Sequence, residues 1–422
     1  MKKCTERPRV LCSLNGAVDV IGNLHKGIPI LHAGPGCSMQ AAVMTNLYYL
    51  GGYHGMPSSN TYEREVVFGG ADRLRETIRG SLDVMDGELY AVLTGCTMGI
   101  IGDDVKAVLK EFEDSPYPLI SVDVAGFKGD TNYGYQAAMM EVVRKLAKKT
   151  EPNPRLVNLY GQVPSQDMTL RGDLEELERV FAKLGLELNT FFIREDGIAQ
   201  LKNSGNAALN VNISPWMCKN LDAYYERAFG IPTLRYPGMP VGPTAVGEFM
   251  GALSERLGLD RAAAERAISD ERRYAYAYFD SLMGNFERHR YILVGESNAA
   301  LGIARFLTND CGHIPLAVIF TDDAPQSAQK EAEAHIRALE CDNRIADVYF
   351  ENDVYLIEQL AQKYSGRATM LLGSTYEKNI AKALDAFFVT VSAPCLDKEI
   401  LNKSHVGIRG CISLMEDMYN HY

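Results

Sequence analysis

Three cysteines in the first hundred residues have the chemistry to bind a soft metal. Cys12 stands in LCSLNGA, Cys37 in HAGPGCSMQAA and Cys96 in LTGCTMGIIGDD. Each follows an apolar run typical of a strand and precedes small residues and a helical pattern. Such a turn directs backbone amides, and the positive end of the next helix, toward its apex. Three such turns side by side would gather three thiolates at one sheet edge, which suits an anionic iron–sulfur cluster.

The same cysteines also allow a purely structural interpretation. Free cysteine is among the most buried residue types and often only fills space in a core. No two of the three form a CxxC, so their spacing does not separate a ligand from a core residue. From the chemistry alone, a cluster site and an inert core are both open.

Bulk composition narrows the class of protein. The chain has 422 residues, which exceeds one ordinary hydrophobic core and predicts two or three domains. A formal net charge of −11 argues against nucleic acid or an anionic membrane surface as a partner. No apolar run reaches membrane-spanning length, and the basic start is not followed by the apolar stretch of a signal peptide. Nine dispersed cysteines indicate reduced thiols or metal ligands, so we expect a cytoplasmic protein.

Strand and helix patterns alternate along the whole chain. ELYAVLTG and PLISVDV predict strands over 88–95 and 118–124, with a helix between them that Asp103 caps. The same rhythm restarts at RLVNLYG and again at RYILVG. Because strands that alternate with helices form parallel sheets with right-handed crossovers, we expect an α/β fold of three Rossmann-like domains.

Polar and helical links predict where these domains meet. KKTEPNPR is a proline-bearing link, and a charged, tyrosine-rich helical segment spans 254–290. We therefore expect an N-terminal domain over 1–150 that carries the three cysteines. A second domain with a helical connector follows over 151–288. A third, over 289–422, ends in the helix CISLMEDMYNHY, which packs back on the fold.

Several stretches, in order, resemble the nitrogenase component 1 superfamily, and more closely its β-type (K-type) subunit. They are CSLNGA, HAGPGC, TGC with GDD after it, EREVVFGGADRL, DVAGFKGDTNYGY, FGIPTLRYPGMPVGPTAVGEF and GSTYEKNI. The resemblance covers essentially the whole chain and implies an oxidoreductase subunit with the component 1-like fold. It also implies that Cys12, Cys37 and Cys96 are this subunit's ligands to a P-cluster at the interface with an α-type subunit.

The resemblance further implies the partners and the cofactor. An α-type (D-type) subunit would pair with this chain, as a heterotetramer with two copies of each, and would hold the active-site cofactor. An ATP-dependent iron protein would deliver electrons, since the chain contains no GxxxxGK[ST] motif of its own. The cluster would be P-cluster-like, of the 8Fe-7S type, or 4Fe-4S in the case of a nitrogenase-like reductase.

Three positions bear on what this subunit does within the family. Where the β subunit of the molybdenum enzyme has a serine that can ligate its oxidised P-cluster, VAGFKG places Gly126, which predicts a plainer one-electron relay. The α-type subunit holds its cofactor through a cysteine and a histidine, and the matching positions here are Ser214 and Ser392. Hydroxyls are poor ligands for such metals. A shifted alignment would bring Cys218 or Cys395 to those positions instead.

Three other functions stay open: a scaffold that assembles the cofactor, a reductase of a tetrapyrrole or a thioether, and a metal-free multi-Rossmann binding protein. The missing signal peptide and the cysteine trio argue against the last, which would be of the periplasmic type. The sequence does not choose the substrate, because the substrate site is expected in the partner chain.

The remaining polar motifs are expected to be structural. His32 is predicted to be buried and bonded to backbone, and Glu63 and Glu65 to be solvated charges on a strand. GESNAALG follows a strand as a nucleotide-binding turn does, but it lacks the full GxGxxG and predicts helix–sheet packing. A structural role is also expected for the other cysteines, which are Cys4, Cys218, Cys311, Cys341, Cys395 and Cys411.

Overall fold

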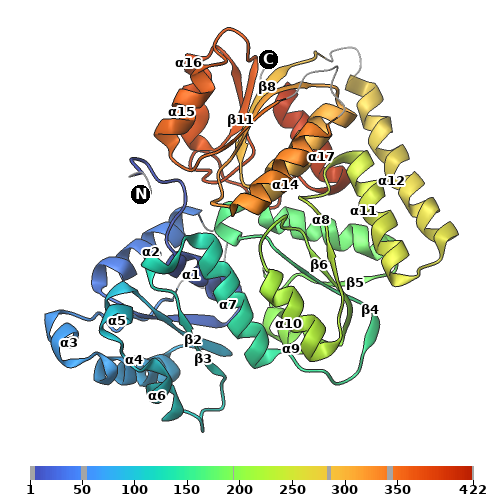
Figure 1. Cartoon of the computed structure of the whole chain (residues 1–422). Coiled ribbons are helices and arrows are strands. Elements are labelled where there is room, and N and C mark those ends of the chain that lie inside the picture. Colours follow the sequence, from blue (N-terminus) through green and yellow to red (C-terminus); the bar gives the residue numbers. More distant parts are fainter. Residues whose placement is uncertain (1–4, 49–54, 193, 283–286, 340–345, 421–422) are drawn as a thin grey trace.

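The computed structural model describes residues 5–48, 55–192, 194–282, 287–339 and 346–420. Three separate sheets divide the molecule into three lobes (Figure 1). Their strand orders are β1-β2-β3, β5-β4-β6-β7 and β10-β9-β8-β11-β12. Every strand pair within these sheets is parallel, as the alternating pattern predicts.

The first sheet is covered on both faces, because its central strands are apolar at every position. Its strands are β1 (Gly27–His32), β2 (Leu89–Thr94) and β3 (Leu119–Asp123). Leu89, Ala91 and Leu93 face α1 (Ser13–Asn23) and α7 (Thr131–Leu146). Tyr90 and Val92 face the opposite side, against α4 (Ala71–Val84) and α6 (Val105–Lys110).

Three further helices of this lobe lie near the ends of its strands: α2 (Pro35–Tyr48), α3 (Glu63–Phe68) and α5 (Cys96–Ile101). The strand prediction for the segment that contains Glu63 and Glu65 is wrong, because EREVVF forms α3. The Glu65 carboxylate accepts a bond from the Tyr62 amide at the start of that helix, as in a capping box.

The second sheet and the helices around it follow. Its strands are β4 (Asn153–Tyr160), β5 (Glu187–Asn189), β6 (Ala207–Asn212) and β7 (Thr233–Arg235). Its helices are α8 (Leu170–Lys183), α9 (Gly197–Asn203), α10 (Lys219–Phe229), α11 (Gly242–Leu257) and α12 (Arg261–Leu282). The final helix α17 (Gly407–Tyr419) returns to pack against α8, α11 and α12 (Figure 1).

The third sheet forms the remaining lobe. Its strands are β8 (Arg290–Gly295), β9 (Ile314–Phe320), β10 (Asp347–Phe350), β11 (Met370–Gly373) and β12 (Phe387–Thr390). Its helices are α13 (Ser297–Arg305), α14 (Gln326–Arg337), α15 (Val354–Gln362) and α16 (Lys378–Ala383). Each sheet lies within one of the three expected domain ranges, and the boundaries themselves stay a prediction. Among the described helices, none combines the length and hydropathy needed to cross a membrane.

Helices α1 and α7 cross in backbone contact, and this crossing sets the position of Cys12 at the start of α1. A Cβ atom added to Gly16 would lie 1.9 Å from the carbonyl oxygen of Thr131. A Cβ added to Gly134 would lie 1.9 Å from the carbonyl oxygen of Ser13. The two first turns therefore approach each other as closely as glycine alone allows.

We predict that Gly16→Ala and Gly134→Ala each destabilise the protein, by about 1–3 kcal/mol or more, because the added methyl group forces two backbones apart. Alanine otherwise favours a helix, so the matched control is Gly80→Ala in α4, where an added Cβ meets nothing within 4 Å. That control should gain about 0.5–1 kcal/mol. Urea unfolding followed by circular dichroism measures all three. Equal stabilities for the Gly16, Gly134 and Gly80 variants would contradict the close crossing.

Candidate metal centre

Two of the three cysteines occupy neighbouring strand-to-helix turns, as predicted. Cys37 lies in the first turn of α2, shortly after β1, and Cys96 is the first residue of α5, directly after β2. Strands β1 and β2 are parallel and in register up to the pair His32 and Thr94. Because parallel neighbours end at the same edge, both thiols come from that edge of the sheet.

Cys12 reaches the site by a different route, and the prediction of a strand before it is wrong. Residues 8 and 12 make only isolated bridges, to Asp353 and Asp130, and Cys12 is the N-cap of α1. The Thr131 amide donates to the carbonyl of Leu11 (3.0 Å), and the Ser13 amide to that of Gly129 (3.1 Å). Cys12 is therefore held beside the turn that follows β3, the third strand of the same sheet.

Gly126, in that turn, shows that the thiols converge. Its amide donates to Cys96 Sγ over 3.0 Å. A Cβ built on Gly126 would lie 3.1 Å from Cys96 Sγ and 3.6 Å from Cys12 Sγ. Burial raises the pKa of the Cys37 thiol, and the nearby thiols of Cys96 and Cys12 raise it further. All three cysteines are half-buried and free of disulfides.

The donor set fits an iron–sulfur cluster better than a single ion. In the part of the chain that the structure describes, no three His, Cys, Asp or Glu side chains lie close enough to hold one metal ion. A single zinc ion, by comparison, holds its thiolates at about 2.3 Å. Open space of ≈ 640 Å³ borders Cys12 and Gly126. Three soft thiols with space beside them suit a bulky anionic core, to which Gly126 allows close backbone approach.

A buried hydrogen-bonded group lies behind the thiols. His32 Nδ1 is 3.0 Å from Ser59 Oγ, and His32 Nε2 is 3.0 Å from Asp103 Oδ2. His32 is thus buried as predicted, but its partners are side chains rather than backbone, and neither ring nitrogen is free to bind metal. Burial lowers the pKa of His32, and the bond to Asp103 opposes that shift.

Asp103 joins this group to the glycine pair of EREVVFGGADRL. Its Oδ2 also accepts from the Gly70 amide over 2.8 Å. The helix cap predicted for Asp103 is instead made by Asp104, whose carboxylate accepts from the Ala107 amide over 3.0 Å. Asp103 therefore ties the segment before α4 to the end of β1, next to the cysteine turns.

The positions that match the cofactor ligands of an α-type subunit are hydrogen-bonded within this chain. Ser214 Oγ accepts from the Met217 amide over 3.0 Å, and Ser392 Oγ accepts from the guanidinium of Arg9. Burial raises the pKa of the Cys218 thiol. A cavity between the second and third lobes, lined by Asp167, His405 and others, holds only ≈ 10 Å³, about the volume that one water requires.

The other described cysteines are placed as structural residues would be. Cys311 and Cys411 are buried, and burial raises the pKa of both thiols. Cys395 is half-buried, with Sγ 3.6 Å from the carbonyl oxygen of Lys398. Cys4 and Cys341 lie outside the described residues.

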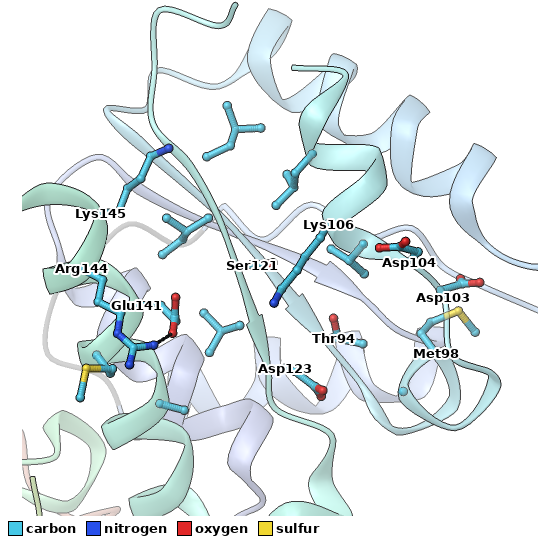
Figure 2. A pocket seen from close by; sticks show the side chains of 18 of the residues that line it. Thr94, Met98, Asp103, Asp104, Lys106, Ser121, Asp123, Glu141, Arg144 and Lys145 are labelled. Atoms are coloured by element: carbon cyan, nitrogen blue, oxygen red, sulfur yellow. Dashed lines mark hydrogen bonds and ion pairs between the residues drawn. The ribbon is translucent and has the colours of Figure 1, made fainter. Parts of the chain in front are cut away.

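A pocket of ≈ 840 Å³ lies at the open edge of β3, between α6 and α7, and no cysteine lines it. Figure 2 shows Lys106, Glu141, Arg144 and Lys145 along its walls, with the Glu141–Arg144 ion pair at 2.7 Å. Charged side chains beside an unpaired edge strand discourage other strands from adding to it. We therefore interpret this pocket as a protected sheet edge, separate from the thiol site.

Comparisons with known proteins agree with this geometry. The family model for nitrogenase component 1 type oxidoreductases matches residues 12–422. The nitrogenase vanadium-iron protein beta chain of Trichormus variabilis is 25% identical over 96% of this chain and 90% of its own length. The molybdenum-iron protein beta chain of Clostridium pasteurianum is 23% identical over 98% and 92%. A light-independent protochlorophyllide reductase component from Halorhodospira halophila is 24% identical over 90% and 71%.

The fold is also that of a solved nitrogenase. The structure titled "Nitrogenase Cp1 at pH 6.5" superposes with a TM-score of 0.83 and 20% identity, over all of this chain and 93% of that one. The resemblance seen in the motifs and the predicted component 1-like α/β fold are thus both confirmed. The chain belongs to the nitrogenase component 1 type oxidoreductases, as a β-type or nitrogenase-like subunit.

Proposed function

We propose that this chain is the β-type subunit of a nitrogenase or nitrogenase-like oxidoreductase, and that Cys12, Cys37 and Cys96 bind an iron–sulfur cluster shared with an α-type partner. The observation that carries the proposal is the convergence of the thiols around Gly126. When bound, such a cluster stores and passes on single electrons at low potential. The cluster is of the P-cluster-like 8Fe-7S type, or 4Fe-4S if the protein is a nitrogenase-like reductase.

The residues of this chain bind the group and set its surroundings. The three thiols ligate as thiolates, and the first turns of α1 and α2 direct the positive ends of two helices toward that charge. The Gly126 amide donates to Cys96 Sγ, and hydrogen bonds to a ligand sulfur tune the potential of a cluster. Because glycine has no side chain to offer as a ligand, position 126 suits a one-electron relay.

Exposed apolar side chains beside the thiols support an α-type partner. Ile100, in the helix that begins at Cys96, is 73% exposed, and Phe127, next to Gly126, is 60% exposed. Met39, two residues after Cys37, is 66% exposed. Such patches mark protein–protein interfaces, and a partner that covers them also keeps water from the cluster. We infer a heterotetramer with two copies of each subunit, to which an ATP-dependent iron protein delivers electrons.

A nitrogenase-like reductase of a tetrapyrrole is the second candidate. Components of light-independent protochlorophyllide reductases from three organisms match this chain at 24–25% identity. Three thiols from this chain serve either enzyme class equally well, and the substrate site lies in the partner. Activity of the co-purified complex toward dinitrogen and toward tetrapyrroles separates the two. A complex that turns over neither substrate would favour a scaffold for cofactor assembly.

We predict that Cys37→Ala and Cys96→Ala strip iron and acid-labile sulfide from the anaerobically purified complex, because loss of one thiolate leaves an iron open to oxidation. Iron and sulfide analysis with EPR measures the loss. The control Cys311→Ala removes a buried thiol elsewhere and should leave iron content unchanged. Full iron content in either test variant would disprove the ligand assignment.

The second prediction concerns the partner. Ile100→Ser and Phe127→Ser together should leave the isolated chain folded, since both side chains are exposed in it, but should abolish pairing with the α-type subunit. Size-exclusion chromatography after co-expression measures the pairing. Val84→Ser, on a side chain that is 82% exposed in α4, is the control. A heterotetramer that survives the double change would place the interface elsewhere.

The third prediction is that this subunit does not ligate the active-site cofactor. Changing Cys218 or Cys395 to Ala in the assembled complex should leave the cofactor's spectroscopic signal intact, because the matching positions are the hydrogen-bonded Ser214 and Ser392. If either change removed that signal while the cluster at Cys37 survived, the chain would be an α-type subunit.

A further inference from the structure

The third sheet has the crevice at which doubly wound proteins usually bind ligands. Its strand order is β10-β9-β8-β11-β12, so the chain proceeds outward from β8 in one direction and from β11 in the other. The crevice outside the carboxyl ends of two such central strands is the common ligand site of open α/β sheets. GESNAALG supplies the turn after β8, and GSTYEKNI the turn after β11.

In this protein an arginine from the N-terminal segment fills that crevice. The Arg9 guanidinium donates to Glu377 Oε1 (2.7 Å) and Oε2 (2.8 Å) and to Ser374 Oγ (2.9 Å), all after β11. It also donates to the Ala393 carbonyl (2.8 Å) after β12. The side chains of Arg9 and Glu377 are 2% and 0% exposed.

The turn after β8 faces the same guanidinium. Burial raises the pKa of the Glu296 carboxyl to about 8, and the charge of Arg9 is the main effect that opposes this shift. All three turns around the crevice are thus in contact with Arg9 or within reach of its charge. A phosphate or nucleotide would have to displace this buried ion pair to enter.

The segment around Arg9 joins the third lobe to the first. The amides of Glu6 and Arg7 donate to the Asp353 carboxylate (2.8 and 3.1 Å), and the Arg9 amide to the Asn352 carbonyl (3.0 Å). Three residues after Arg9, Cys12 is already bridged to Asp130 in the first lobe. In Figure 1 this dark-blue segment runs from the third lobe toward α1. Residues 6–13 form what we term the N-terminal arm.

We propose that Arg9 is a positioning residue for Cys12: by filling the third-lobe crevice, it holds the N-terminal arm so that this thiol meets those of Cys37 and Cys96. The proposal rests on the proposed function, in which Cys12 is a cluster ligand. Cys37 and Cys96 are placed by β1 and β2 of their own sheet. Cys12 has no strand before it and depends on contacts at both ends of the arm.

The test uses the complex with its α-type partner. Arg9→Met alone leaves the buried Glu377 charge unpaired and can unfold the third lobe. The main variant is therefore the double change Arg9→Met and Glu377→Gln, which removes both charges. Arg9→Lys keeps the charge but loses the planar fork that reaches several acceptors. The matched control is Arg7→Met, in the same arm, where the side chain is 58% exposed and pairs with Glu358 at 3.6 Å.

Two measurements separate this proposal from the proposed function. Hydrogen exchange of the arm amides, in the metal-free chain, reports whether Arg9 holds the arm. Chelator titration with EPR reports how tightly the cluster is held and in what geometry. We expect faster exchange over residues 6–13 in the double variant, iron retention weaker by about 10–100-fold, and an altered EPR line shape. Arg9→Lys should lie between the double variant and wild type, and Arg7→Met should match wild type.

Either of two results would overturn the proposal. Unchanged exchange in the double variant would mean that Arg9 does not hold the arm. Faster exchange with unchanged iron retention and EPR would mean that Cys12 is positioned without it. A wild-type complex that contains no iron would overturn the proposed function instead, and with it the role of Arg9 toward a cluster.

Discussion

The contact between the start of α1 and the turn after β3 is the constraint on which the candidate metal centre depends. Ser13 Oγ donates to the carbonyls of Val124 and Ala125, both over 2.9 Å, directly beside Gly126. Gly16 and Gly134 allow the two helices to approach until backbone meets backbone. Without that approach Cys12 would lie farther from Cys96, and the first sheet would present two thiols instead of three. The site is thus a property of helix packing as much as of its ligands.

Glycine serves this site in two distinct ways. At positions 16 and 134 it removes volume between helices, so that the protein's own backbones meet. At position 126 it removes volume beside two thiols, and its amide still donates to Cys96 Sγ. The first use sets where Cys12 lies, and the second determines what the thiols can hold. A cluster larger than a single ion needs both, because its ligands must be close together yet leave space between them.

The interior between the lobes also distinguishes this chain from a cofactor-binding subunit. Ser214 and Ser392 each have hydrogen-bond partners within the chain, and the cavity lined by Asp167 and His405 is about the size of one water molecule. Arg9 fills the crevice of the third sheet, where a Rossmann-like domain would otherwise offer a ligand site. The chemistry of this chain is thereby concentrated at the half-buried edge of its first sheet, where the exposed apolar side chains also lie.

The sequence by itself determined the fold class and two of the three thiol positions. Apolar runs followed by glycine and a helical pattern are local signals, so the turns at Cys37 and Cys96 and the parallel strands before them could be predicted from short windows. The family could be recognised because its motifs keep their order along the whole chain, and the family model later matched the same span.

Only the tertiary structure decided how Cys12 reaches the site, what His32 binds and where Arg9 lies. Each of these depends on residues far apart in sequence: Cys12 on Asp130, His32 on Asp103, and Arg9 on Glu377. The apolar run before Cys12 is strand-like, but it pairs with no sheet, because the Arg9 side chain and the Asp353 carboxylate bind the segment as an arm instead. Local pattern reports propensity. Burial of a charge with its partner is a property of the folded chain, and here it prevailed over propensity.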